Sequence, residues 1–227
     1  SVVPTAYEEN HDGMSTSTAI DNMGALLGNG GIDYRSPSFD LGGATASFKY
    51  NYTPEASGAA VGEGGVSASS GTMASGQALG IDISMGGISV GAFGAEVDAD
   101  SLGAPTTATG RTQGDAFDGT WYAKYTTGPV SFGYQTAYID RGANGNSAAN
   151  TGSKYVTTAS GVFESEMMSI AFNVNENLSF SWSELEETYD DQSNVNTGTE
   201  IADVAMESTS IQFAYTMGSM SIKGYQT

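Results

Sequence analysis

A tight turn followed at once by an apolar residue, a serine and a second apolar residue recurs along the whole chain. The turns begin roughly 42 to 47 residues apart by direct count. The five triplets that follow them are Ala46-Ser47-Phe48, Ile88-Ser89-Val90, Val130-Ser131-Phe132, Leu178-Ser179-Phe180 and Met220-Ser221-Ile222. A repeat of this length indicates one supersecondary unit used several times, and it constrains the fold more than any other feature.

An alternating segment also precedes each turn. Met168–Val174 and Ile211–Met217 show it most clearly, because apolar residues alternate there with small or polar ones. Alternation with a period of two, rich in β-branched and aromatic residues, indicates a half-buried strand. Each repeat is therefore a β-hairpin. We predict five hairpins, or ten strands of about 8 to 12 residues, and only Thr18–Leu27 has a helical pattern.

Long polar segments rich in Gly, Ser, Asn and Asp join the hairpins, and such segments predict loops. They cover residues 53–76, 98–115, 141–157 and 189–207. Short turns at one end of the strands and long loops at the other are typical of transmembrane antiparallel β-barrels. We therefore expect an all-β chain that forms part of such a barrel.

The composition excludes several classes of function. Only 15% of the 227 residues are charged, against ~25% in soluble domains. The 26 acidic and 7 basic residues give a net charge of −19, which leaves no basic face for nucleic acid. The chain has no cysteine and one histidine, His11, which excludes disulfides, thiolate metal sites and multi-histidine sites. No nucleophile, phosphate-binding or zinc motif occurs, so we predict neither an enzyme nor a cofactor.

The two faces of the predicted strands differ in polarity. The apolar positions near the turns are rich in aromatic residues, namely Phe48, Phe132, Phe172, Phe180 and Trp182, as expected where a barrel meets the membrane interface. The intervening positions carry Ser, Thr, Gly, Ala, Asn and Gln, which suits the wet wall of a channel. The same alternation occurs in acidic all-β adhesins and binding proteins without a pore, and this alternative stays open.

Four segments resemble the outer-membrane porins of alphaproteobacteria, particularly marine ones. They are Val3–Gly13, Tyr122–Tyr125, Phe132–Thr136 and Phe213–Ile222. The resemblance implies a sixteen-stranded trimeric porin in the outer membrane of a Gram-negative bacterium. Its partners would be two further copies of the chain, membrane lipid and lipopolysaccharide. Small hydrophilic solutes and ions would cross by passive diffusion through a channel that the third long loop narrows.

The acidic opening segment fits that third loop. With residues 1–27 as the constriction loop, residues 28–227 supply the five hairpins, which become strands six to fifteen of the sixteen. The first five strands and the closing strand are then not in this sequence. We therefore expect the chain to be part of a single, longer barrel domain.

A constriction needs charges on opposite sides of the channel. We predict that Glu8, Glu9, Asp12 and Asp21 supply the negative side from the opening segment. The positive side would come from wall residues that alternate with apolar neighbours, namely Arg35, Lys49 and Lys124. The net charge of −19 favours cations at the mouth. The alternative that Glu8, Glu9 and Asp12 are solvated loop charges stays open.

A second acidic group comprises Glu184, Glu186, Glu187, Asp190 and Asp191. We expect it at the end of a strand that enters an acidic external loop. It is either a solvated run of charges or a site where divalent cations bridge to lipopolysaccharide or to a neighbouring subunit.

Overall fold

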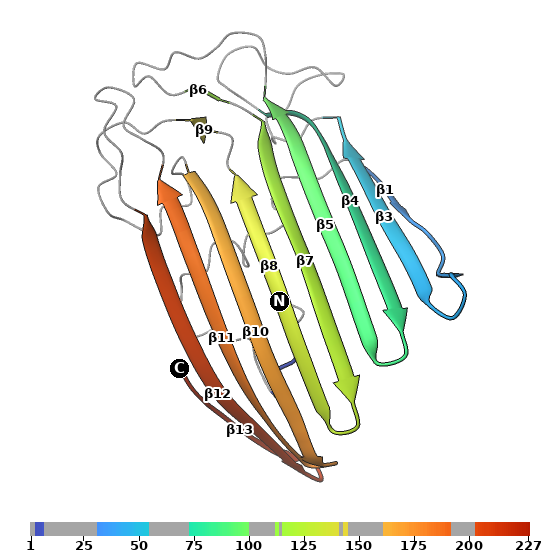
Figure 1. The fold of residues 1–227 in the computed structure, drawn as a ribbon, viewed down its shortest axis with the longest axis vertical. Coiled ribbons are helices and arrows are strands. Elements are labelled where there is room, and N and C mark those ends of the chain that lie inside the picture. Colours follow the sequence, from blue (N-terminus) through green and yellow to red (C-terminus); the bar gives the residue numbers. More distant parts are fainter. Residues whose placement is uncertain are drawn as a thin grey trace.

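A computed structural model describes residues 3–6, 31–54, 73–99, 112–113, 115–140, 143–144, 161–191 and 203–227. One antiparallel sheet contains almost all of them (Figure 1). The strands are β1 (Ile32–Arg35), β2 (Phe39–Asp40), β3 (Thr45–Thr53), β4 (Met73–Met85), β5 (Ile88–Ala99), β6 (Thr112–Gln113), β7 (Ala116–Thr127), β8 (Val130–Asp140), β9 (Ala143–Asn144), β10 (Gly161–Asn175), β11 (Leu178–Asp191), β12 (Val204–Met217) and β13 (Met220–Gln226). Among the described residues there is no apolar helix of membrane-spanning length.

The order of strands in the sheet is β1-β3-β4-β5-β7-β8-β10-β11-β12-β13, with β2 paired to β3. These ten successive strands are the ten that the repeat predicts, and the all-β antiparallel fold is confirmed. The differences are local. β4, β10, β11 and β12 have 13, 15, 14 and 14 residues, so they are longer than expected, whereas β1 and β13 have 4 and 7 residues and are shorter. The short strands β6 and β9 pair with each other within segments expected to be loops. Among the described strands, β1 and β13 end the path without pairing to each other.

The turns of the hairpins lie along one end of the sheet, and the strand ends that lead into the long connections lie at the other (Figure 1). Gly86, Gly128 and Gly218 begin three of the turns with φ angles of 59°, 54° and 60°, a left-handed conformation that glycine adopts without a steric penalty. In the β10–β11 turn the side-chain oxygen of Asn175 instead accepts hydrogen bonds from the backbone N–H groups of Asn177 and Leu178. Local turn chemistry thus fixes each hairpin.

The register separates the sheet into an apolar face and a polar face, because paired residues point to the same side. One row across the apolar face is Tyr125, Phe132, Ile170, Trp182 and Ile211. The next row, on the polar face, is Lys124, Gly133, Ser169, Ser183 and Ser210. Exposure is the reverse of that in a soluble protein. Phe132 and Ile211 are 46% and 58% exposed, whereas Ser183 and Ser210 are 0% and 1% exposed.

Apart from Ala46, the buried apolar side chains of the sheet lie on the polar face, most of them toward the ends of the strands that carry the long connections. Phe163 and Tyr189 stack there with ring centroids 4.4 Å apart. A second cluster joins Met167, Leu185 and Met206 to Val3, which precedes the sheet by many residues. The core of the described molecule therefore covers part of the polar face and leaves the apolar face open.

The segment Val3–Ala6 lies against the polar face. The backbone N–H of Ala6 donates a hydrogen bond to Oγ of Ser181 over 2.8 Å. Gly133 makes the contact possible, because a Cβ atom at this position would collide with Pro4 and lie 3.0 Å from Cα of Val3. The opening segment and the polar face are thus in contact at the residues that the structure describes.

Candidate functional site

The basic residues of the described chain are Arg35, Lys49, Lys124 and Lys223, and all four lie on the polar face. Arg35 pairs directly with Lys49 in the β1–β3 register. Lys124 belongs to the row of buried serines, and Lys223 is opposite Ala214 on the same face. The expected common face of Arg35, Lys49 and Lys124 is therefore present. Their role at a constriction stays a prediction.

Two of these cations have acidic partners. Nε of Arg35 lies 3.0 Å from Oδ2 of Asp33, two residues earlier on β1. Nζ of Lys49 lies 3.4 Å from Oδ2 of Asp82 on β4. Both pairs are accessible to solvent, so they contribute little to stability and act mainly on the local potential. Within the described residues Lys124 has no acidic group at ion-pair distance.

Asp82 lies on the same polar face and is not among the residues predicted from the sequence. Its Oδ1 accepts a hydrogen bond from the hydroxyl of Tyr122 over 2.7 Å. The available signal was the segment Ile81-Asp82-Ile83, in which the acid alternates with residues of the apolar face. That alternation places a negative charge on the face that carries the predicted cations. Pairing across strands is what brings it to Lys49.

The predicted negative side falls outside the described residues. Glu8, Glu9, Asp12 and Asp21 are all in the undescribed part of the opening segment, so their place relative to the wall stays a prediction. Val3–Ala6 is the nearest described part of that segment. Its contact with Gly133 and Ser181 puts it on the same face as Lys124.

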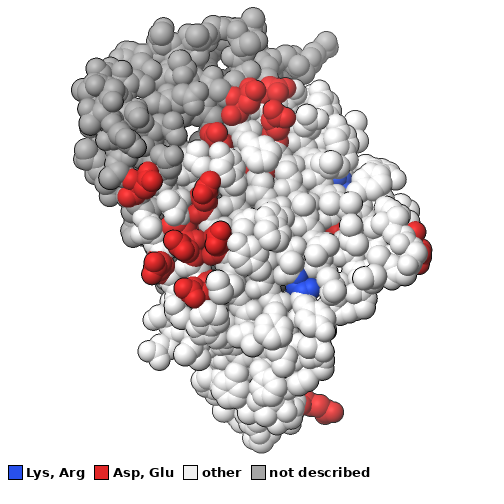
Figure 2. Space-filling model, in the orientation of Figure 1, with Lys and Arg blue, Asp and Glu red and all other residues white. Residues whose placement is uncertain are grey.

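Acidic side chains interrupt the apolar face over β10, β11 and β12. Glu186 pairs directly with Glu166 on one side and with Glu207 on the other, and we call these three residues the glutamate ladder. Figure 2 shows acidic side chains gathered over this part of the sheet. Glu184 lies on the same face, whereas Glu187 lies on the polar face and is only 4% exposed. The predicted acidic group is therefore divided between two faces, because β11 remains a strand as far as Asp191.

Another acidic group lies on β5 and just before β7. Carboxylate oxygens of Glu96, Asp98 and Asp115 lie within 4.8 Å of one another, and all three residues are exposed. Asp98 also accepts a hydrogen bond from Ser75. Oxygen ligands of this kind suit a hard cation such as Ca²⁺.

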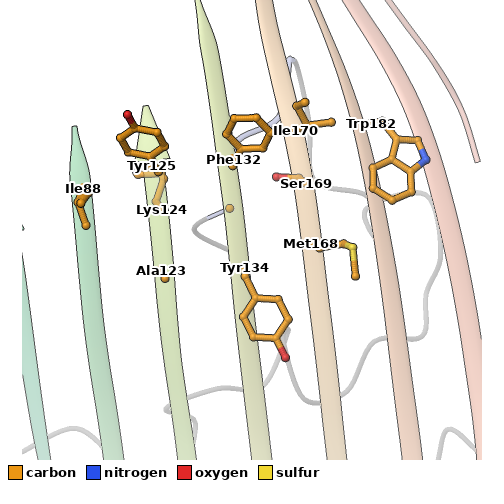
Figure 3. A pocket seen from close by; sticks show the side chains of 11 residues that line it. Ile88, Ala123, Lys124, Tyr125, Phe132, Tyr134, Met168, Ser169, Ile170 and Trp182 are labelled. Carbon is orange, nitrogen blue, oxygen red and sulfur yellow. The ribbon is translucent and has the colours of Figure 1, made fainter. Parts of the chain in front are cut away.

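The apolar face is hollowed between β5 and β11 (Figure 3). The groove has a volume of about 740 Å³, and its lining includes Tyr125, Phe132, Tyr134, Ile170 and Trp182. The small side chain of Ala123 lies between the larger ones and leaves room for the hollow. The groove contains few polar groups, so it offers no site for chemistry, only an apolar surface.

Comparison with known proteins assigns no family: no protein-family model matches the chain, and no curated protein matches it significantly. The geometry of the two faces therefore carries the functional argument.

Proposed function

We propose that the chain is part of a porin, a transmembrane β-barrel through which small hydrophilic solutes and ions diffuse across a bacterial outer membrane. One observation carries the proposal: the apolar face of a wide antiparallel sheet is exposed, whereas much of the polar face is buried. In a soluble sheet the apolar face packs inward. In a membrane barrel the apolar face meets lipid and the polar face lines a wet interior.

The extent of the apolar face supports a lipid environment. Large exposed side chains occur on every long strand of the sheet, from Tyr50 on β3 to Ile222 on β13. Soluble monomers rarely expose an apolar patch of more than a few hundred Å². Burying such a surface is favourable by about 25 cal/mol per Å². Lipid therefore accounts for a surface that water would destabilise.

A sheet in lipid also needs a partner for each edge strand, because unpaired backbone groups are costly there. Closure with further strands satisfies this need, and the family resemblance supplies a number: ten of sixteen strands are present. We also propose a homotrimer, contacts with lipid and lipopolysaccharide, and a location in the outer membrane. Each of these proposals rests on the porin resemblance.

The polar face would form the wall of the channel. Its small polar residues suit the wall of a channel, and its four described cations give it a local field. The contact of Val3–Ala6 with this face supports a constriction formed by residues 1–27. Glu8, Glu9, Asp12 and Asp21 would then oppose Arg35, Lys49 and Lys124 across the lumen. With a net charge of −19, we expect the channel to prefer cations.

The glutamate ladder gives weight to one alternative. Three glutamates at directly paired positions repel one another unless water or counter-ions surround them. An acidic all-β adhesin or binding protein without a pore would have water on both faces of its sheet. An adhesin function does not explain why the long uncharged rows of the apolar face are exposed. The porin accounts for both if the ladder lies beyond the lipid.

Reconstitution in a planar lipid bilayer separates the two functions. The complete protein, flanking strands included, should give stepwise, ohmic and cation-preferring conductance, because a hydrated lumen carries current in proportion to voltage. Protein denatured by heat before addition is the control. A silent bilayer, together with a protein that is monomeric in water without detergent, would refute the porin.

A further inference from the structure

Four neighbouring strands build a network on the polar face around one carboxylate. Asp82 on β4 pairs with Gly91 on β5, which pairs with Tyr122 on β7. The three residues therefore form one row on the same face. The Tyr122 hydroxyl reaches across β5 and donates to Oδ1 of Asp82 over 2.7 Å, while Oδ2 faces Nζ of Lys49 on β3 at 3.4 Å. Each carboxylate oxygen thus has its own partner.

Gly91 leaves the space that the network needs. A Cβ atom at this position would collide with the ring of Tyr122 and lie 2.8 Å from Oδ1 of Asp82. Gly91 lies within a regular strand, and its φ is not in the left-handed region, so turn geometry does not explain the glycine. The open position lets the phenol cover β5 and hold the carboxylate in place.

The network decides how much charge this part of the wall presents. Lys49 and Asp82 have side chains that are 53% and 42% exposed, so both charges act on the space in front of the polar face. Together they nearly cancel. Arg35 is balanced by Asp33 in the same way, whereas Lys124 has no acidic neighbour at ion-pair distance in the described chain.

We propose that Asp82 is a selectivity-determining residue of the channel, which cancels the charge of Lys49, and that Tyr122 is its positioning residue. The inference rests on the proposed porin function. It changes the expected positive side of the wall, because the field there comes chiefly from Lys124 and not from Lys49.

The test measures the reversal potential of the reconstituted complete protein in a KCl gradient. Asp82→Asn should lower the K⁺ to Cl⁻ permeability ratio by about twofold to fivefold, which a unit charge about 8 Å from the ion path in screened water produces. Lys49→Gln should raise the ratio. The double variant Asp82→Asn/Lys49→Gln should return it close to the wild-type value. Glu176→Gln, in the exposed β10–β11 turn, changes the net charge equally and should have no effect.

Two further comparisons keep the outcome decisive. Comparing Lys49→Gln with the double variant measures the effect of losing Asp82 in a second background. This comparison therefore tests the role of Asp82 even if the single variant Asp82→Asn does not insert into the bilayer. Tyr122→Phe should lower the ratio in the wild-type background and leave it unchanged in the Asp82→Asn background, which a general loss of structure would not do. If open channels of Asp82→Asn match those of Glu176→Gln, the role of Asp82 is refuted and the porin stands. If wild-type protein forms no channels, both fail.

Discussion

The apolar face has two parts that differ in how far the uncharged surface extends from the turns. On β4 the residues Met85, Ile83, Ile81 and Leu79 follow one another on this face without a charge. On β11 the apolar run is Leu178, Phe180 and Trp182, and then Glu184 and Glu186 follow. β4 ends at a tight turn and β11 begins after one, and both keep the same alternation. The identity of the residues, not the strand geometry, therefore sets the height of the apolar band.

On the proposed porin function, the difference indicates where lipid gives way to water. A glutamate side chain in lipid is costly, and directly paired glutamates repel each other. Water and counter-ions reduce both effects. β10, β11 and β12 are also the longest strands of the sheet. On the proposed porin function, we infer that the glutamate ladder lies above the membrane, as do Glu96 and Asp98 at the far end of β5, and that the uncharged positions next to the turns of β4, β5, β7 and β8 stay within it.

The largest effect should come from a charge placed in each part. Ile81→Arg on β4 should lower the free energy of unfolding in lipid vesicles by ~2–4 kcal/mol, because an arginine near the middle of the bilayer loses its hydration. Thr209→Arg on β12, an exposed position paired with Glu184, should change it little. Tryptophan fluorescence during denaturant unfolding measures both. Equal losses would mean that the two parts share one environment.

A chain without cysteine allows the boundary to be located directly by labelling. Glu186→Cys should react with a membrane-impermeant maleimide when the protein is in vesicles, whereas Ile81→Cys should react only after detergent removes the lipid. Gel-shift detection of the label reports the two rates. Labelling of Ile81→Cys in intact vesicles would place β4 outside the lipid and would favour the soluble alternative.

The smallest effect concerns the ladder itself. Glu186 is the central member and faces a glutamate on each side, so Glu186→Gln should raise the free energy of unfolding by up to about 1 kcal/mol at low salt. The gain should shrink at high salt, because ions screen the repulsion. Glu176→Gln in the turn lacks these neighbours and is the matched control. A gain that is independent of salt would exclude repulsion as its cause.

The repeat was enough to predict the ten strands, their order and the polarity of their faces, because hairpin turns and alternation are encoded locally. Gly86, Gly128 and Gly218 illustrate this: each is the residue that its turn requires. The orientation of Arg35, Lys49 and Lys124 followed from the same parity. These features depend on neighbours in sequence, and a single chain contains that information.

Pairing between distant strands supplied what the alternation did not. The contact of Lys49 with Asp82 depends on the β3–β4 register, and that of Asp82 with Tyr122 spans β5. The division of Glu186 from Glu187 between two faces depends on how far β11 continues. The short strands β6 and β9 pair across two segments that composition marks only as polar. In each case the contact depends on which strands pair and on how far they continue, and the residue type alone does not show this.

The contact between Ala6 and Ser181 joins residues 175 positions apart, whereas every neighbour in the sheet path is also the next long strand along the chain. Its surroundings come from β8, β10, β11 and β12 through Gly133, Met167, Leu185 and Met206. The place that receives Val3 therefore does not exist until these four strands have paired. In terms of assembly, the opening segment is made before the four strands that receive it and can take up its position only after they have paired, so this contact forms late and over a long loop.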